Sequence, residues 1–119
     1  MVLESMETIK DDNYYILKTI EEIELVCSYS KGMSMDDLIK NPAVLDGIVF
    51  RLIQTAEQAD KITDSFKERH KEIKWKNIKG FRNRLVHDYG SVDLDFVYKA
   101  IRIDAPKLRK ALYKASKNK

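Results

Sequence analysis

The chain has 119 residues, 44% of them hydrophobic, and a net charge of +3, which suits a single domain that buries a real core. No apolar run approaches the roughly 18 residues that span a membrane, and the first residues lack the pattern of a signal peptide. A single cysteine, Cys27, excludes an internal disulfide and predicts a reducing compartment, the cytoplasm. Since no Cys/His cluster has metal-ligand spacing and no Gly-rich phosphate loop is present, we expect no metal or cofactor.

Apolar residues recur at helical spacing along the first half of the chain. Asp11 and Asp12 can cap a first helix, and its apolar stripe contains Ile16, Ile20, Ile23 and Cys27, the last expected to be a buried thiol. Gly32 ends this stripe, and Ser34 can cap a short helical turn. Asn41–Pro42 then begins a helix, with an acceptor side chain before a ring that needs no N–H. We expect this helix to be central, because it has the longest apolar face: Leu45, Ile48, Val49, Leu52, Ile53, Ala56, Ala59 and Ile62.

The second half continues the helical pattern. Residues 63–65 can cap a short segment, and His70 is expected to be a surface or structural residue. A helix is predicted over residues 75–87, with Trp75, Ile78, Phe81 and Leu85 in the core. Gly80 costs that helix about 1 kcal/mol relative to Ala, so we expect it to permit a close contact with another helix or subunit. A last helix starts at Asp93, and Pro106 should kink or restart it. The prediction is one all-α domain, an up-and-down bundle of about four to five helices.

Positive charge is concentrated in the second half. Residues 1–64 carry 6 Lys/Arg and 13 Asp/Glu, whereas residues 65–119 carry 16 and 6. Residues 67–84 alone contain 8 basic and 2 acidic side chains. Such a field attracts a polyanion such as nucleic acid. The alternatives are a solvated lysine face, or pairing between the basic and acidic halves within or between subunits.

Residues 82–89 read Arg-Asn-Arg-Leu-Val-His-Asp-Tyr and are the most informative segment for function. A guanidinium can hold a phosphate bidentately at any relevant pH, and an imidazole can give or take a proton near neutral pH. Arg82 and His87 are therefore candidates for metal-free phosphoryl transfer on RNA. The alternative is that Arg, His and Tyr near a helix end are surface and capping residues.

Helical geometry constrains how these groups could cooperate. At about 100° per residue, Asn83 and His87 share a face, whereas Arg82 and His87 lie roughly 140° apart around the axis. One copy therefore does not aim both groups at one point. Two copies that meet across a two-fold axis could each supply an Arg and a His to a shared cleft, so the motif predicts a homodimer.

The segment from Trp75 to Tyr89, with Val92–Asp93 after it, resembles the HepT-type toxins of the HEPN superfamily. Their signature of Arg, four residues, His, one residue and Tyr matches Arg82, His87 and Tyr89. The similarity extends to four further segments: Asn41–Pro42, Asp46–Ile48, Arg69–His70 and Asp104–Leu108. Three positions depart from the family pattern: Lys74, Gly90 and Arg84.

This resemblance implies a HEPN-type helical bundle that forms a homodimer and acts as a metal-independent endoribonuclease, the toxin of a toxin–antitoxin pair. The usual antitoxin in that family is a minimal nucleotidyltransferase, which transfers AMP from ATP to the motif tyrosine, here Tyr89. The implied partners are RNA, with tRNA and mRNA both open, a second copy of the chain and the nucleotidyltransferase. We expect no membrane partner.

Cleavage of RNA by its own 2′-hydroxyl needs a base, an acid and positive charge at the phosphate. We assign His87 to proton transfer and Arg82 to the phosphate, while Asn83 would orient His87 or the phosphate. Tyr89 would stack on or hydrogen-bond to RNA when unmodified and exclude RNA when it carries AMP; the alternative is a tyrosine that packs the helix end. Further RNA-binding residues are expected near the motif: Lys76, Lys79 and Arg84.

Two other functions are compatible with the sequence. A non-catalytic helical module that binds nucleotides or a nucleotidyltransferase would explain the helical pattern and the basic half equally well, but it would not need both Arg82 and His87. A plain dimerisation scaffold would show no salt-sensitive affinity for RNA.

Overall fold

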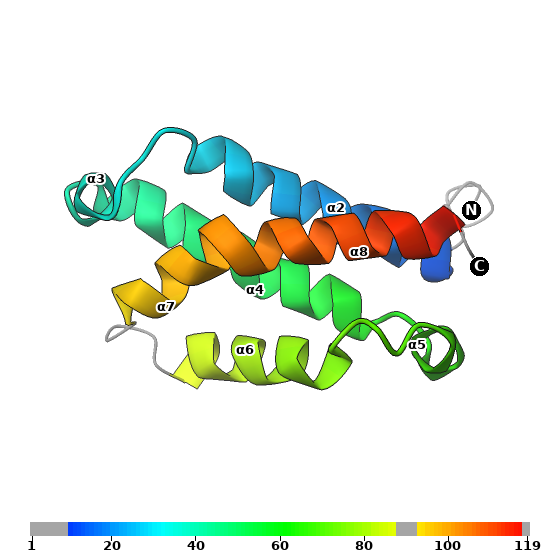
Figure 1. The fold of residues 1–119 in the computed structure, drawn as a ribbon. Helices are drawn as coiled ribbons and strands as arrows, with labels where there is room; N and C mark the ends of the chain where they lie inside the picture. Colours follow the sequence, from blue (N-terminus) through cyan, green and yellow to red (C-terminus); the bar gives the residue numbers. More distant parts are fainter. Residues whose placement is uncertain (1–9, 88–92, 118–119) are drawn as a thin grey trace, which may run out of the picture.

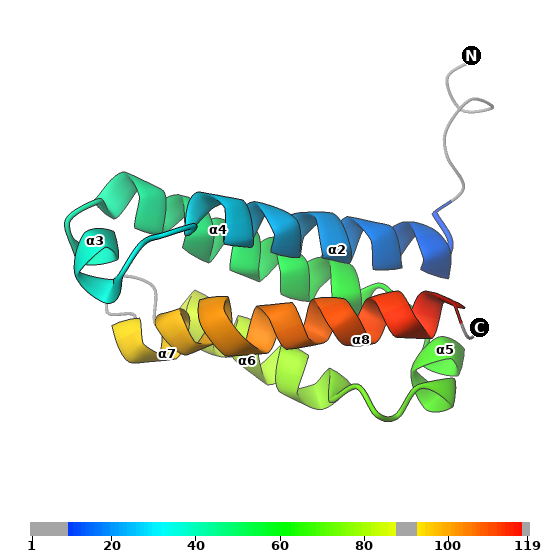
Figure 2. The ribbon, with the colours of Figure 1, turned by 45° about the horizontal axis from the view of Figure 1, so that its top comes forward.

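The computed structural model describes residues 10–87 and 93–117, and these residues are helical almost throughout. The long helical segments run antiparallel to their neighbours in the chain (Figures 1 and 2), which confirms the all-α, up-and-down prediction. They are α2 (Asp12–Tyr29), α4 (Pro42–Asp60), α6 (Trp75–His87) and a final segment made of α7 (Leu94–Lys99), a π-helical turn η1 (Ala100–Asp104) and α8 (Ala105–Lys117). Two short helices, α3 (Met35–Ile39) and α5 (Asp64–Arg69), lie at opposite ends of the bundle.

Most helix starts follow the capping signals of the sequence. The Asp11 carboxylate accepts a hydrogen bond from the Tyr14 N–H at 2.9 Å, and the Thr63 hydroxyl accepts one from Phe66 N–H. Ser34 and Asp37 form a reciprocal capping box at α3. Asn41 is the exception, because its side chain donates to the Asp37 carbonyl oxygen at 2.8 Å instead of accepting from α4. The expected acceptor role of Asn41 was therefore wrong, although α4 does begin at Pro42.

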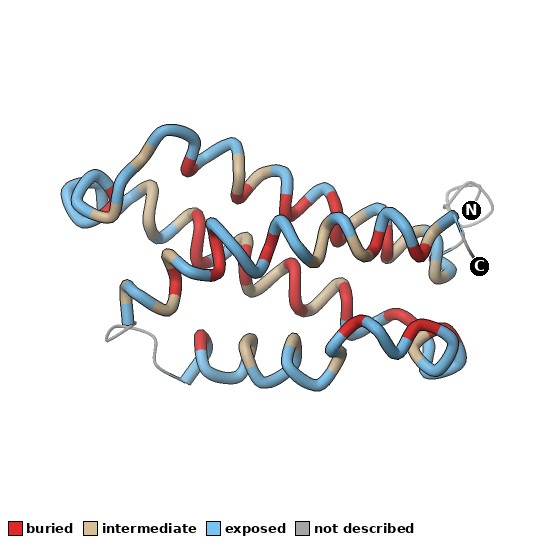
Figure 3. Tube along the Cα trace, viewed as in Figure 1, coloured by how far each residue is buried: buried red, intermediate tan, exposed pale blue. Residues whose placement is uncertain are grey.

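The core lies between α2, α4 and the final helical segment, whose buried positions face one another (Figure 3). As predicted, α4 is central, since it packs against both α2 and α6. Glu22 of α2 is only 9% exposed and forms an ion pair with Arg51 of α4 at 3.0 Å. That carboxylate raises the pKa of Arg51, and the ion pair links the two helices. Cys27 is half-buried, not buried as expected.

Pro106 is the second residue of α8, and the structural change lies just before it, where the helix widens but is not broken. Residues Ala100–Asp104 form a π-turn in which the Ala105 N–H donates to the Ala100 carbonyl oxygen, five residues back. Val97 and Ala105 are buried on either side of this turn, and Ile101 is buried within it. The wider turn keeps these three residues on the core side of one continuous helical segment.

His70 has a structural role. It is 6% exposed, its ring lies 4.3 Å from that of Phe66, and its Nδ1 is 3.3 Å from a Glu72 carboxylate oxygen. Its carbonyl oxygen accepts a hydrogen bond from the Trp75 indole N–H at 3.1 Å. Trp75 is half-buried and anchors the start of α6 to α5, which supports its predicted anchoring role. No helix among residues 10–87 and 93–117 is long and apolar enough to cross a membrane.

Candidate active site

Helix α6 carries the motif and lies along one side of the bundle (Figure 1). Leu85 is its one buried side chain, at 1% exposure, while Ile78 and Phe81 are half-buried. A Cβ built at Gly80 would meet no atom within 4 Å, so within the described part of the chain Gly80 makes no close helix–helix contact. That half of the Gly80 expectation was wrong, and the subunit contact stays a prediction. One face of α6 is therefore open to a substrate or to another chain.

Arg82 is held by an acidic residue of the neighbouring helix. Its Nε and Nη2 both donate to one carboxylate oxygen of Glu57 in α4, at 3.3 and 3.1 Å. Its Nη1 donates to the Asn83 amide oxygen at 3.2 Å. Since a guanidinium has five N–H groups, one N–H on Nη1 and one on Nη2 remain for a ligand. These two N–H groups can donate to oxygens of a phosphate.

Asn83 contacts Arg82 and not His87. Its amide oxygen is the acceptor for Arg82 Nη1, and among the described residues no hydrogen bond joins it to His87. In this arrangement Asn83 orients the guanidinium. The predicted alternatives, orientation of His87 or of a bound phosphate, stay predictions for the complex with RNA.

A cavity of about 250 Å³ lies beside Arg82 between α4 and α6. Lys79 lines it together with Arg82 and Asn83 from α6, and Glu57 and Lys61 line it from the α4 side. Lys79 and Arg82 therefore line the same cavity, which is compatible with the predicted role of Lys79 in RNA binding. The remaining lining residues are Ala56 and Asp60.

His87 is the last residue of α6 and is exposed. It does not line the cavity beside Arg82. One protomer thus keeps the two principal side chains apart, in line with the 140° separation expected from helical geometry. Tyr89, the predicted site of AMP attachment, lies outside the described residues.

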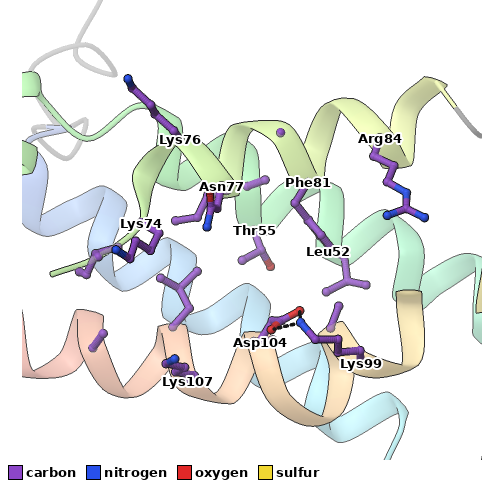
Figure 4. Close-up of a pocket in the computed structure, with 18 of the residues that line it drawn as sticks. Leu52, Thr55, Lys74, Lys76, Asn77, Phe81, Arg84, Lys99, Asp104 and Lys107 are labelled. Atoms are coloured by element: carbon purple, nitrogen blue, oxygen red, sulfur yellow. Dashed lines mark hydrogen bonds and ion pairs between the residues drawn. The ribbon is translucent and has the colours of Figure 1, made fainter. Parts of the chain in front are cut away.

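The other two predicted RNA-binding residues lie towards a different cavity. Lys76 is exposed on α6, and Arg84 places its guanidinium 3.8 Å from the centre of the Phe96 ring. Arg84 also lies 3.5 Å from an Asp93 carboxylate oxygen. Both Lys76 and Arg84 belong to the wall of a larger groove between α6 and the final helical segment (Figure 4). The motif helix therefore separates two cavities.

Glu57 is a site residue that the sequence did not reveal. It precedes Arg82 by 25 residues, and α4 was interpreted only for its apolar face. The available signal was weak: Glu57 directly follows the core position Ala56, so it had to lie at the edge of that face. Its pairing with Arg82 depends on the packing of α4 against α6, which no local pattern encodes.

Comparison with known proteins places this chain in a family. The family model described as "Ribonuclease HepT-like" matches residues 19–115. The "Putative RNase TTE0752" of Caldanaerobacter subterraneus is 29% identical over 96 residues, covering 81% of this chain and 86% of that protein. The "Probable ribonuclease HepT" of Thermococcus cleftensis is 26% identical over 95 residues, covering 80% and 86%.

A third relative is larger. The "Gamma-glutamylcyclotransferase and putative RNase MJ0434" of Methanocaldococcus jannaschii is 29% identical over 105 residues, which are 88% of this chain but 47% of that protein. No solved structure matches the chain. The family model covers most of the chain, including the helix that carries Arg82 and His87, so this protein belongs to the HepT-like ribonuclease family.

Proposed function

We propose that this protein is a metal-independent endoribonuclease in which Arg82 binds the scissile phosphate and His87 transfers protons. The main observation behind this proposal is the way in which the Arg82 guanidinium is held. Glu57 and Asn83 fix its guanidinium at the edge of an open cavity, on the same helix as an exposed His87. A chain of the HepT-like ribonuclease family with this arrangement has the two groups that RNA cleavage needs.

The proposed reaction uses the RNA's own nucleophile. The 2′-oxygen attacks the adjacent phosphorus and loses its proton to a neutral His87, while the bond from phosphorus to the 5′-oxygen breaks. A protonated His87 gives its proton to that leaving oxygen, and the products are a 2′,3′-cyclic phosphate and a 5′-hydroxyl. Arg82 stabilises the charge that develops on the non-bridging oxygens.

Two His87 side chains in different protonation states require two copies of the chain. We propose a homodimer formed through the face of α4 and α6 that carries Arg82. Phe50 of α4 is 52% exposed and Val86 of α6 is 40% exposed. Helices α4 and α6 are antiparallel (Figure 2), and the Glu57–Arg82 pair joins them. Phe50 precedes Glu57 in α4 and Val86 follows Arg82 in α6. Both apolar side chains therefore lie on the same side of this pair, towards the end of the face near Asn41. A second copy would cover them and bring its own His87 to the cleft.

We further propose that the protein is the toxin of a toxin–antitoxin pair and that a nucleotidyltransferase antitoxin silences it. The phenolic oxygen of Tyr89 would attack the α-phosphorus of ATP and release pyrophosphate, leaving AMP on the tyrosine. Tyr89 follows His87 by two residues, so the added anion and purine would occupy the space that RNA needs. The proposed location is the cytoplasm, with RNA as substrate.

The test is incubation of the purified protein, made without any partner, with total RNA in excess EDTA, beside Arg82→Ala and His87→Ala. Cleavage by the wild type alone supports the proposal. Intact mass must first show that Tyr89 carries no AMP. An unmodified, folded protein that leaves RNA intact would refute the nuclease and favour the alternative, a non-catalytic module that binds nucleotides or a nucleotidyltransferase.

A further inference from the structure

The larger of the two cavities beside α6 is a groove on the side of this helix away from Arg82. It has a volume of about 630 Å³, within the roughly 300–1,000 Å³ typical of ligand sites. Its walls come from α6 and the residues before it, from α4, and from the segment α7–η1–α8 (Figure 4). The predicted motif chemistry does not use most of this groove.

The inner surface of the groove is apolar and partly aromatic. Leu52, Ile78 and Leu108 contribute aliphatic surface. The rings of Phe81 and Phe96 lie 5.0 Å apart between centroids and both line the cavity. Figure 4 shows Phe81 and the Asn77 amide projecting into the groove from α6. Flat apolar surface with an amide beside it suits a nucleobase, which offers a π-face for stacking and polar edges for hydrogen bonds.

The rim of the groove is positively charged. Lys99 is neutralised by Asp104 at 3.0 Å, and Glu72 lies beside His70. Lys74 and Lys107 stand on opposite sides of the groove, one before α6 and the other on α8. Among the described residues, no carboxylate lies within ion-pair distance of either lysine. A single nucleic-acid strand carries phosphates that alternate with flat bases. Two ammonium groups on either side of an apolar channel therefore complement such a strand.

The groove approaches His87 along α6. Arg84 lines the groove, and its guanidinium covers the Phe96 ring. It precedes His87 by three residues, a rise of about 4.5 Å along the helix. A strand held at His87 can therefore continue past Arg84 into the groove.

We propose that this groove binds the unpaired nucleotides next to the scissile phosphate, with bases against Phe81 and the aliphatic wall of the groove and phosphates on Lys74 and Lys107. The proposal rests on the proposed ribonuclease function and specifies its substrate as single-stranded RNA. In a duplex the bases are paired and stacked inside the helix, so they cannot enter an apolar groove. The flanking nucleotides thus bind on the opposite side of α6 from Glu57.

The test measures RNA binding separately from cleavage. In a His87→Ala background, Lys74→Gln/Lys107→Gln is compared with Lys31→Gln/Lys40→Gln, which removes the same charge at the α2–α3 end of the bundle. Fluorescence anisotropy in EDTA follows binding of a labelled uracil-only RNA strand and of the same strand paired with adenine-only RNA. The groove variant should bind the single strand about tenfold more weakly at ~0.1 M salt, with a salt slope lower by about 1.4, or 0.7 per phosphate contact.

Three outcomes would overturn the proposal. If both double variants lost RNA affinity equally, the loss would come from the lower net charge and not from the groove. Equal affinity of the wild-type groove for duplex and single strand would remove the strand preference. Weaker self-association in sedimentation, with unchanged RNA affinity, would assign the groove to a second copy of the chain. Cleavage is scored separately with intact His87, so groove-dependent binding without cleavage would keep the groove and refute the nuclease.

Photo-crosslinking provides a second, independent readout. A strand that contains 4-thiouridine should crosslink to peptides from α6 and from the segment α7–η1–α8, and the groove variant should lose those adducts. Crosslinks confined to α2 or α3 would contradict binding in the groove. Circular dichroism checks that each variant is folded, which is expected because Lys74 and Lys107 are exposed.

Discussion

Glu57 and Arg82 join α4 to α6 at the point where the motif begins, with one carboxylate oxygen accepting from both Nε and Nη2 of the guanidinium. The side chains of this pair are 38% and 41% exposed, so its contribution to stability is small, at most about 1 kcal/mol. Its importance is geometric. The carboxylate occupies the Nε edge of Arg82 and leaves the far end of the guanidinium for a phosphate.

Glu57→Ala should lower RNA cleavage through kcat by about ten- to a hundredfold, because the guanidinium loses its fixed orientation. Unfolding in urea should shift by less than about 1 kcal/mol. Glu57→Gln, which keeps an oxygen acceptor, should retain intermediate activity. Equal activity of wild type and Glu57→Ala would show that Arg82 needs no partner in α4.

Two substitutions in α6 test the packing of that helix and the proposed dimer. Gly80→Ala should stabilise the protein by up to about 1 kcal/mol, because the position is helical and a Cβ there has open space. Val86→Glu, on the face proposed for the subunit interface, should fold equally well but dissociate the dimer, as measured by analytical ultracentrifugation, because Val86 is 40% exposed in the protomer. A Val86→Glu variant that stays dimeric would place the subunit interface elsewhere.

Leu85→Ala should destabilise the protein by about 2–5 kcal/mol, because Leu85 is the one buried side chain of α6. The measurement is urea unfolding followed by circular dichroism. Leu17→Ala is the matched control, since Leu17 is 52% exposed and should cost little. If both variants unfold at the same urea concentration, α6 is not fixed by Leu85.

The capping box of α3 should make stability depend on pH in the acid range. The Asp37 carboxylate is hydrogen-bonded by the backbone N–H of Ser34, which has the larger effect, and by the Ser34 hydroxyl. Both hydrogen bonds lower the pKa of Asp37 below its ordinary value of 3.8. Because the folded pKa is the lower one, this contribution is present above pH 3.8 and is lost as the pH falls through the folded pKa. Asp37→Asn should make the free energy of unfolding in urea depend less on pH across that window.

The pH dependence of cleavage tests the two-histidine scheme. If one His87 acts as base and the other as acid, kcat/KM should rise and fall with pH in a bell shape. The measurement uses a fluorescent RNA strand in EDTA across the pH range in which the fold is stable. A profile with a single limb would leave only one titrating group in the reaction.

Local signals explain why much of the fold was predictable. Asp11, Ser34 and Thr63 cap their helices through hydrogen bonds to residues three positions ahead, so the sequence itself contains both partners. The bounds of α6, Trp75 to His87, were predicted for a similar reason, because apolar residues recur at helical spacing along this segment. The side chain of Asn41 was not predictable, because its amide can donate as well as accept.

The candidate site was predictable only in part, because it depends on packing between helices. The motif identified Arg82 and His87, but not Glu57, which reaches Arg82 across 25 residues. Gly80 resembled a close-contact position, yet the protomer leaves space around it. The groove was invisible in the sequence for the same reason. Phe81 and Phe96 come from separate helices, and only their packing places both rings in one wall.

The π-turn at Ala100–Asp104 makes this stretch sensitive to the number of residues and less to their identity. Buried residues Val97, Ile101 and Ala105 follow one another at intervals of four, and each interval would drift by about 40° in a regular α-helix. The extra residue of the turn cancels that drift. A one-residue deletion here would rotate all of α8 by about 100° relative to α7, carrying Leu112 out of the core and Lys107 off the groove. A change in the length of this turn must therefore be compensated elsewhere in the same helix.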